Sequence, residues 1–414
     1  MKKFFIFFLG ILVVLLSSCS KPATKAVTEL ELACWVYDLE LQEVVDQFNA
    51  SHDDCQIIVT AYYDKDGNST AALNRMKTKL LTEQNVDIIC LDSLDEMALE
   101  NAGLLMDLYP LMEKDDSFCA DDYYMNIWNL FSKGGKLFEF VNCYQLGCLY
   151  GRPELLADRS GWTIDEFCEF RHDLKESTNW DALSISNELM LSMMVQFSME
   201  NYIDTTTNEC NFDSISFCQW LSFVKGFQNT TNACALGHCW LWGVLSCVND
   251  KVNYGYLPSY VGYPSSYAGG PCAMALCSYG ITSYTQHADL CWEFLMSTLS
   301  EETQLAVYND NGFLMNRHAQ STQLKAATLS TANSASILYG QRDQNGDYFN
   351  PLTKEEQDRI ITMLNQIDNV RFRYYDVLQI IEDEAAAYFS DDKSVEETAA
   401  LIQNRVSIYL SEKN

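Results

Sequence analysis

Aromatic rings and carboxylates follow three predicted β-strands near the N-terminus, and this mixture of side chains could bind a neutral sugar. Trp35 and Asp38 follow the first strand, Tyr63 ends the second, and Asp92 ends the third. In open α/β sheets, ligands bind beyond the carboxyl ends of the strands. Flat rings cover the apolar C–H faces of a sugar, and carboxylates accept hydrogen bonds from its hydroxyls. The alternative is that the rings belong to the core and the carboxylates merely end the strands.

A second set of candidate binding residues lies in the middle of the chain. Trp240 and Trp242 stand two residues apart in "GHCWLWG" and cannot share one face of a helix, so we expect one of them to face a cleft or a turn. Tyr267 and Gly269 lie in the predicted turn "SSYAGG", where glycine would let the backbone approach a ligand closely. Tyr144 lies on a predicted crossover between two halves of the protein and is expected to line a cleft between them.

The sequence lacks the residues that several common metal-binding and catalytic motifs require. The acidic stretches 64–75 and 343–354 begin like calcium loops but carry the wrong residues at key positions. His238 lies between two cysteines, without a second cluster at zinc-ligand spacing. The nucleophile, zinc-protease and phosphate-loop motifs are absent from the sequence. We therefore predict no catalytic residue, metal or cofactor. A hydrolase that uses two carboxylates stays open, because paired carboxylates abound in this chain.

The charge balance restricts the partners. The 414 residues include 27 Lys and Arg against 57 Asp and Glu, a net charge of −30. Such a surface disfavours nucleic acid, anionic lipid surfaces and polyanionic ligands. It favours a neutral, polar or cationic ligand. The acidity could also serve only to keep the protein soluble.

The N-terminus has the layout of a secretory signal peptide. Lys2 and Lys3 precede an apolar run that ends in Leu16-Ser17-Ser18-Cys19. Leu followed by two small residues and a cysteine is similar to a bacterial lipobox. That resemblance implies removal of residues 1–18, lipid on the Cys19 thiol, and a membrane anchor through residues 19–28. The apolar run is shorter than the roughly 20 residues that a membrane-spanning helix needs.

Cysteine usage leaves two alternatives open. The chain has sixteen cysteines, and three pairs share the spacing C-x4-C: Cys143/Cys148, Cys234/Cys239 and Cys272/Cys277. An exported protein favours disulfides. Many of these cysteines nevertheless lie in apolar runs and would pack as small buried side chains. If Cys19 carries lipid, fifteen cysteines remain, and a monomer must keep at least one thiol.

Periodicity predicts an α/β protein. Strands are expected at 29–37, 56–63 and 86–92, and helices at 41–50, 71–83 and 94–103, the last ending at Gly103. This alternation predicts a parallel sheet covered by helices on both faces. Further helices are expected at 184–199, 214–228 and 287–300, with strands and turns at 251–283. Capping boxes are predicted at Thr163/Glu166, Thr353/Glu356 and Ser394/Glu397, the last opening the final helix.

The order of these landmarks resembles the sugar-binding, maltose-binding-protein-like branch of the extracellular solute-binding proteins of ABC importers. The resemblance spans nearly the whole mature chain and rests on segments 86–113, 134–167, 254–265, 280–300 and 393–412. One departure is the missing proline near Phe140–Asn142, where we expect hinge and ligand contacts to differ. The resemblance implies an aromatic platform near Trp240 and Trp242.

The resemblance also implies the architecture and the partners. It implies a two-lobed periplasmic-binding-protein-like fold of type II, each lobe a mostly parallel sheet flanked by helices. Lobe 1 would comprise 29–139 and about 272–320, and lobe 2 about 140–271 and 321–414. A monomer would capture a solute, most simply a neutral sugar, and deliver it to a membrane permease. The alternatives are a lipid-anchored glycan hydrolase and a sensing lipoprotein that does not transport.

Overall fold

The computed structural model describes residues 27–63, 69–91, 99–100, 102–157, 159–198, 202–204, 207, 209–309, 311–328, 351–371 and 375–412. Cys19 and the predicted signal peptide lie outside these residues. Within them, no helix combines the length and the apolar character needed to cross a membrane.

The first third of the chain alternates strands and helices, as predicted. The elements are β1 (Thr28–Cys34), α2 (Leu39–Ser51), β2 (Cys55–Ala61), α3 (Ser69–Thr82) and β3 (Ile88–Cys90). β1 pairs in parallel with both β2 and β3. Gly103 has the left-handed φ of +66° expected at a helix end, although most of the predicted helix 94–103 lies outside the described residues.

The middle of the chain is richer in helices. The elements are α5 (Tyr109–Lys114), α6 (Met125–Phe131), β4 (Phe140–Gly151), α7 (Pro153–Leu156), β5 (Trp162–Thr163), α8 (Ile164–Thr178), α9 (Asn187–Ser198), β6 (Ile203–Asp204), β7 (Glu209–Cys210), α10 (Ile215–Lys225), β8 (Leu236–Leu241) and α11 (Val244–Tyr254). The predicted capping box at Thr163 and Glu166 opens α8, and Trp162 packs edge-on against Phe167 at 5.2 Å between ring centroids.

The last third contributes both strands and helices. The elements are β9 (Ser259–Val261), β10 (Pro264–Ser265), β11 (Cys272–Ile281), α12 (Ala288–Ser297), α13 (Glu301–Val307), β12 (Phe313–Leu314), α14 (Arg317–Ala326), α16 (Lys354–Asn365), β13 (Asn369–Val370), α17 (Tyr375–Phe389) and α18 (Val395–Glu412). Both C-terminal capping boxes form.

One prediction in this region is wrong. The strand- and turn-like stretch was expected to begin at Lys251, but residues 251–254 complete α11. The helix continues because Val244, Val248 and Lys251 are buried at helical spacing, and Gly255, with φ of +76°, ends it.

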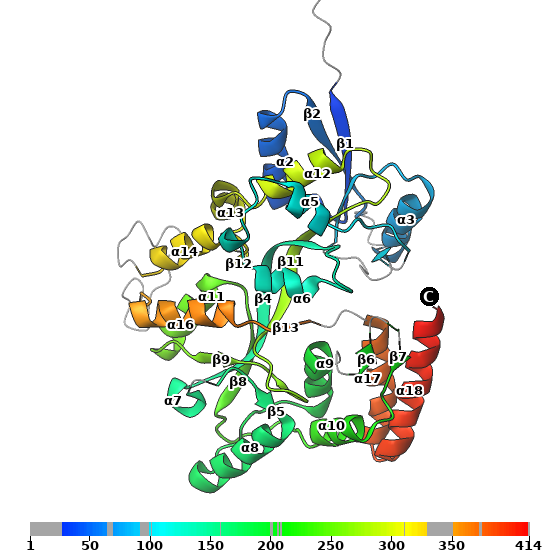
Figure 1. The fold of residues 1–414 in the computed structure, drawn as a ribbon. Coiled ribbons are helices and arrows are strands. Elements are labelled where there is room, and N and C mark those ends of the chain that lie inside the picture. The colour runs from blue at the N-terminus through cyan, green and yellow to red at the C-terminus, as the bar shows by residue number, and fades with distance from the viewer. Residues whose placement is uncertain are drawn as a thin grey trace, which may run out of the picture.

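Two long antiparallel strands, β4 and β11, run through the middle of the main sheet (Figure 1). One end of β11 pairs with β3, beside β1 and β2, and its other end pairs with β13. β4 likewise pairs with β12 near one end and with β8 and β9 near the other. The same two strands therefore belong to both halves of the molecule. Within the main sheet, the antiparallel pairs all involve β4 or β11. A separate antiparallel pair joins β6 to β7.

The hydrophobic side chains form two large clusters. The first core lies around β1, β3 and the beginning of β4 and includes α2, α12 and α13. The second core lies around α8, α9, α10, α17 and α18. A smaller cluster packs α3 against β3. The register of β4 and β11 shifts at Cys277, within the first core. The two large clusters meet further along these strands, near Leu149 of β4 and Cys272 of β11.

Candidate functional site

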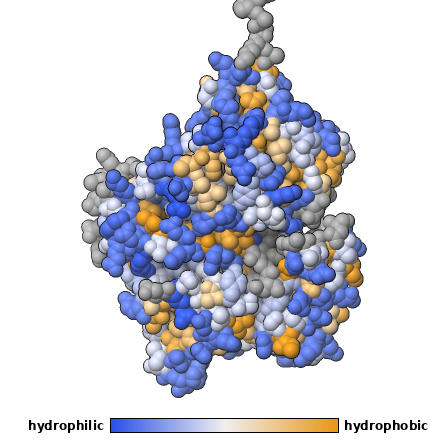
Figure 2. Space-filling model, in the orientation of Figure 1, coloured by the Kyte–Doolittle hydropathy of each residue, from blue (hydrophilic) through white to orange (hydrophobic). Residues whose placement is uncertain are grey.

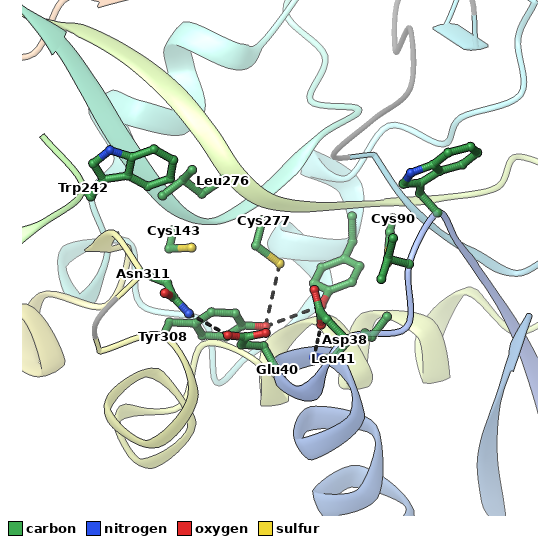
Figure 3. A pocket seen from close by; sticks show the side chains of 13 residues that line it. Asp38, Glu40, Leu41, Cys90, Cys143, Trp242, Leu276, Cys277, Tyr308 and Asn311 are labelled. Atoms are coloured by element: carbon green, nitrogen blue, oxygen red, sulfur yellow. Dashed lines mark hydrogen bonds between the residues drawn. The ribbon is translucent and has the colours of Figure 1, made fainter. Parts of the chain in front are cut away.

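A cavity of about 410 Å³ lies beside β4 and β11, at the level of that register shift (Figure 3). Its size is within the range of small-molecule sites. It is lined by Trp35, Val36, Asp38, Glu40, Leu41, Cys90, Cys143, Trp242, Leu276, Cys277, Tyr279, Tyr308 and Asn311. The lining residues come from segments far apart in the sequence, from Trp35 after β1 to Asn311 before β12. Trp242 directly follows β8, and its neighbours Leu241 and Val244 pack in the first core.

The segment between β1 and α2 presents Trp35 and Asp38. β1 ends at Cys34, and the Trp35 ring meets the Tyr63 ring edge-on, with 5.7 Å between centroids. Asp38 is the N-cap of α2, and its Oδ1 accepts a hydrogen bond from the Leu41 amide at 2.9 Å. This bond satisfies an amide that a helix start otherwise leaves without a partner. The second carboxylate oxygen of Asp38 remains able to accept from a ligand hydroxyl.

A polar pair lies on the same side of the cavity. The Asn311 amide donates to Glu40 Oε1 at 2.9 Å, which links the loop before β12 to the first turn of α2. Both side chains point toward the cavity in Figure 3. Together with Asp38 they bring two carboxylates and one amide to the wall of the same cavity. Such groups accept from and donate to sugar hydroxyls.

The inner wall of the cavity is made of tyrosines and thiols. The Tyr279 and Tyr308 hydroxyls lie 3.5 Å apart, and the Cys277 thiol donates to Tyr308 Oη at 3.8 Å. Burial raises the pKa of both phenols well above the usual value, so both stay neutral at physiological pH. Cys90 and Cys143 add two more small, weakly polar side chains. This wall suits the apolar parts of a ligand better than its hydroxyls.

Two glycines fix the position of Trp242. Gly243, at φ of +123°, lies so close to Gly312 that an added Cβ would come within 2.5 Å of the Gly312 carbonyl oxygen. No other residue type would fit there. The Trp242 amide donates to Ser246 Oγ at 3.0 Å, and 51% of the Trp242 surface is exposed. The Trp242 backbone is therefore held against the loop that precedes β12, while about half of the residue's surface stays exposed.

The structure brings three of the predicted binding residues to this cavity, namely Trp35, Asp38 and Trp242. Tyr63 is next to them through its contact with Trp35, and half of its surface is exposed. Asp92 lies outside the described residues. The rule that ligands bind at strand ends therefore pointed to Trp35 and Asp38, and the paired tryptophans of the sequence pointed to Trp242.

Four other predicted residues lie elsewhere. Tyr144 is fully buried and packs on Phe313 in the first core, so it does not line the cavity. Trp240 points to the opposite side and packs on Phe197 at the second core.

The turn with Tyr267 and Gly269 is not part of this cavity either. Gly269 does permit a close approach, but the group that approaches it is backbone of the same chain and not a ligand. A Cβ on Gly161 or Gly262 would come within 2.0 Å of the Gly269 carbonyl oxygen. The backbone of this turn is therefore packed inside the second half, which corrects the expectation that it approaches a ligand.

Sequence reasoning missed seven lining residues that carry polar or sulfur atoms: Glu40, Cys90, Cys143, Cys277, Tyr279, Tyr308 and Asn311. Glu40 could have been predicted, because it follows Asp38 in the first turn of a predicted helix. Cys90 was predicted to be a small buried side chain, whereas Cys143 and Cys277 were noted only as members of spaced cysteine pairs. Nothing local marks the two tyrosines or Asn311. Among the described residues, no group of three or more His, Cys, Asp and Glu is placed to hold a metal ion.

No family model matches the sequence, and no curated protein sequence matches it significantly. Solved structures do match the fold. The sugar-binding protein MalE from the phytopathogen Xanthomonas citri has a TM-score of 0.60 at 14% identity, covering 93% of this chain and 98% of that chain.

Two further matches extend over similar lengths. The cyclic α-maltosyl-1,6-maltose binding protein of Arthrobacter globiformis has a TM-score of 0.58 at 14% identity, covering 94% of this chain and 100% of that chain. An ABC substrate-binding protein of Listeria monocytogenes, solved with cycloalternan, has a TM-score of 0.55 at 12% identity, covering 93% and 99%. The chain therefore has the two-lobed periplasmic-binding-protein fold of these sugar-binding and ABC substrate-binding proteins, which confirms the predicted fold class.

Proposed function

We propose that this protein is an extracytoplasmic solute-binding protein that captures a neutral carbohydrate or oligosaccharide and delivers it to an ABC-transporter permease. The observation that carries the proposal is the cavity beside β4 and β11, which Trp35 and Trp242 both line. These two residues fall in different lobes of the division that we propose. The named structural neighbours bind sugars, which supports the same ligand class here.

The chemistry of the cavity supports a neutral ligand. Aromatic rings pack on the apolar faces of sugars, and Asp38, Glu40 and Asn311 can exchange hydrogen bonds with hydroxyls. An anionic solute would meet two carboxylates and no Lys or Arg among the lining residues. A site built from both halves also suits closure about a hinge. We place that hinge at the register shift of β4 and β11, where the lobes 29–139 with 272–320 and 140–271 with 321–414 would meet.

Binding without turnover is the reaction that we propose, and a monomer is the form. The neighbours are binding proteins, which supports this assignment over a hydrolase. A purified protein should show saturable one-to-one binding in calorimetric titrations with neutral linear or cyclic oligosaccharides. Chromatography of the same mixtures should show the sugar unchanged. If no sugar gives a detectable binding signal while peptides or polyamines do, the proposed ligand class is refuted. A shortened sugar product would refute binding without turnover.

We also propose that Cys19 carries a lipid that anchors the protein through residues 19–28, after removal of residues 1–18. The support is the sequence layout, because a short apolar run followed by Leu-Ser-Ser-Cys is typical of exported lipoproteins. A diacylglycerol on the Cys19 sulfur would supply two acyl chains, enough to keep the protein stably at the membrane, where a permease lies.

Metabolic labelling tests the anchor. Cells that express the full chain and receive an alkyne fatty acid should label the wild-type protein, whereas Cys19→Ala should lose the label and leave the membrane fraction. Ser20→Ala is the matched control and should behave like the wild type. A Cys19→Ala protein that still takes up the label would contradict the anchor.

A further inference from the structure

Two cysteines that do not line the cavity lie opposite each other on neighbouring strands. Cys148 of β4 and Cys239 of β8 are register partners in an antiparallel pair. Their sulfur atoms are 3.5 Å apart. All fifteen cysteines of the described residues are thiols rather than disulfides.

The backbone geometry at this position already suits a disulfide. Directly opposed residues in antiparallel strands have Cα atoms about 4.5 or 5.5 Å apart, and disulfides span Cα separations of about 4.4 to 6.8 Å. A bond of about 2.05 Å needs the two sulfurs to approach by roughly 1.5 Å, which side-chain rotation can supply. No strand has to shift its register.

A second cross-strand pair is less well placed. Cys143 and Cys277 are partners on β4 and β11, but the register shifts on both sides of Cys277. The Cys277 thiol is directed to Tyr308 Oη. By contrast, β4 and β8 stay in register from Leu146 to Gly151.

We propose that Cys148 and Cys239 are the site of a structural disulfide, formed by exchange with a small-molecule disulfide, which joins β4 to β8 and stabilises the second half of the molecule. The bond would close a loop between residues 91 positions apart. That loop contains β5, α8, α9 and α10, which supply much of the second core. Closing so long a loop restricts the unfolded chain strongly.

The exchange has two steps. The more accessible Cys239 thiolate attacks the disulfide reagent, forms a mixed disulfide and releases one thiol. Cys148 then loses its proton to solvent and attacks the Cys239 sulfur, and the second reagent thiol leaves. Two protein thiols are oxidised as one reagent disulfide is reduced. Burial and the adjacent Cys239 thiol raise the pKa of Cys148 well above its usual value, so the second step should accelerate as pH rises. An exported location, which is part of the proposed function, would provide the oxidising surroundings.

Peptide mapping tests the bond without any sugar. The chain is incubated with oxidised glutathione at pH 8, its remaining thiols are alkylated, and non-reduced peptides are fragmented in a mass spectrometer. We expect one cross-link, Cys148 to Cys239. Cys239→Ser should abolish it, and the matched control Cys234→Ser, on the same segment, should retain it. A cross-link between Cys143 and Cys277, a cross-link of Cys148 that survives in Cys239→Ser, or the absence of any cross-link would overturn the assignment.

Thermal unfolding tests the stabilising role. The oxidised wild type should unfold about 5 °C or more above the reduced wild type, and Cys239→Ser should show no such difference. A bond that forms without raising the midpoint would contradict the proposed role. Failure of sugar binding would leave both tests unaffected, because neither uses a ligand.

Discussion

Trp242 is the most exposed aromatic side chain among the residues that line the cavity. Its ring is half-exposed, and Gly243 fixes its backbone against Gly312. Loss of one aromatic platform from a sugar site removes apolar contact area and ring stacking that together contribute about 1 to 2 kcal/mol.

Trp242→Ala should therefore weaken binding of the best oligosaccharide by about tenfold or more, while the unfolding midpoint stays close to that of the wild type. Calorimetry measures both the affinity and the stoichiometry. Trp180→Ala is the matched control, because Trp180 is also partly exposed and does not line the cavity. Equal affinities of the two variants would remove Trp242 from the site.

Asp38 has two roles that substitution can separate. Its carboxylate caps α2 and also lines the cavity. Asp38→Ser keeps an oxygen that can cap the helix, whereas Asp38→Ala loses it at a cost of about 1 kcal/mol.

We expect Asp38→Ser to unfold within about 0.5 kcal/mol of the wild type but to bind the sugar roughly tenfold more weakly, because a hydrogen bond to a charged group is lost. Urea titration and calorimetry on the three proteins check this expectation. If Asp38→Ser binds as tightly as the wild type, Asp38 only caps the helix.

The residues of the site were only partly predictable, for physical reasons. Trp35 and Asp38 follow from a rule about strand ends. Tyr144 on β4 is adjacent to the lining residue Cys143, and Trp240 on β8 is two residues from Trp242. Alternation along a strand does not say which of its faces meets the cavity and which meets the core. Cys143 and Cys277 line the cavity only because β4 and β11 pair there, a contact between distant parts of the chain.

At the scale of elements, α11 and α16 are joined by a buried ion pair. Lys251 Nζ donates to Glu356 Oε2 at 2.5 Å and to the Pro351 carbonyl at 2.8 Å. Both side chains are largely buried, at 7% and 15% exposure. Burial alone would raise the pKa of Glu356, but the bonds from Lys251 and from the Thr353 amide outweigh it and lower that pKa.

Glu356→Gln should destabilise the protein by about 3 kcal/mol at pH 7, because it leaves the Lys251 ammonium buried without its counter-charge. A carboxyl whose folded pKa is lowered contributes its stability above the unfolded pKa and loses it as the pH falls through the folded value. The gap in urea midpoints between variant and wild type should therefore shrink below about pH 4.5. Glu355→Gln, one residue away and exposed, should show no gap. A gap that does not change with pH would contradict the ion pair.

Most elements were predictable because their signals are local. The first strands and helices fall within a few residues of the predicted bounds, and all three capping boxes form. The last turn of α11 was missed because the Tyr, Gly and Pro residues that follow Lys251 favour turns, and burial along one helix face outweighs them. The pairing of β4 with both halves depends on contacts across more than a hundred residues, and only the family resemblance suggested it.

At the scale of the whole molecule, two cores share one sheet, and the cavity lies where the shared strands change register. The surface in Figure 2 is largely hydrophilic, and apolar residues gather on this face at mid-height, between the two halves. A hinge at the shared strands would bring Trp242 and the Trp35 segment closer together around a solute. Under the proposed function, such a movement would couple capture of the solute to its release.

The structure of the protein crystallised with its best-binding oligosaccharide tests the central claim most directly. We predict one sugar in the cavity beside β4 and β11, with a ring on Trp242 and hydroxyls bonded to Asp38, Glu40 or Asn311. The two halves should lie closer together than in crystals without sugar. A sugar bound elsewhere on the molecule, with this cavity filled only by water, would contradict the account.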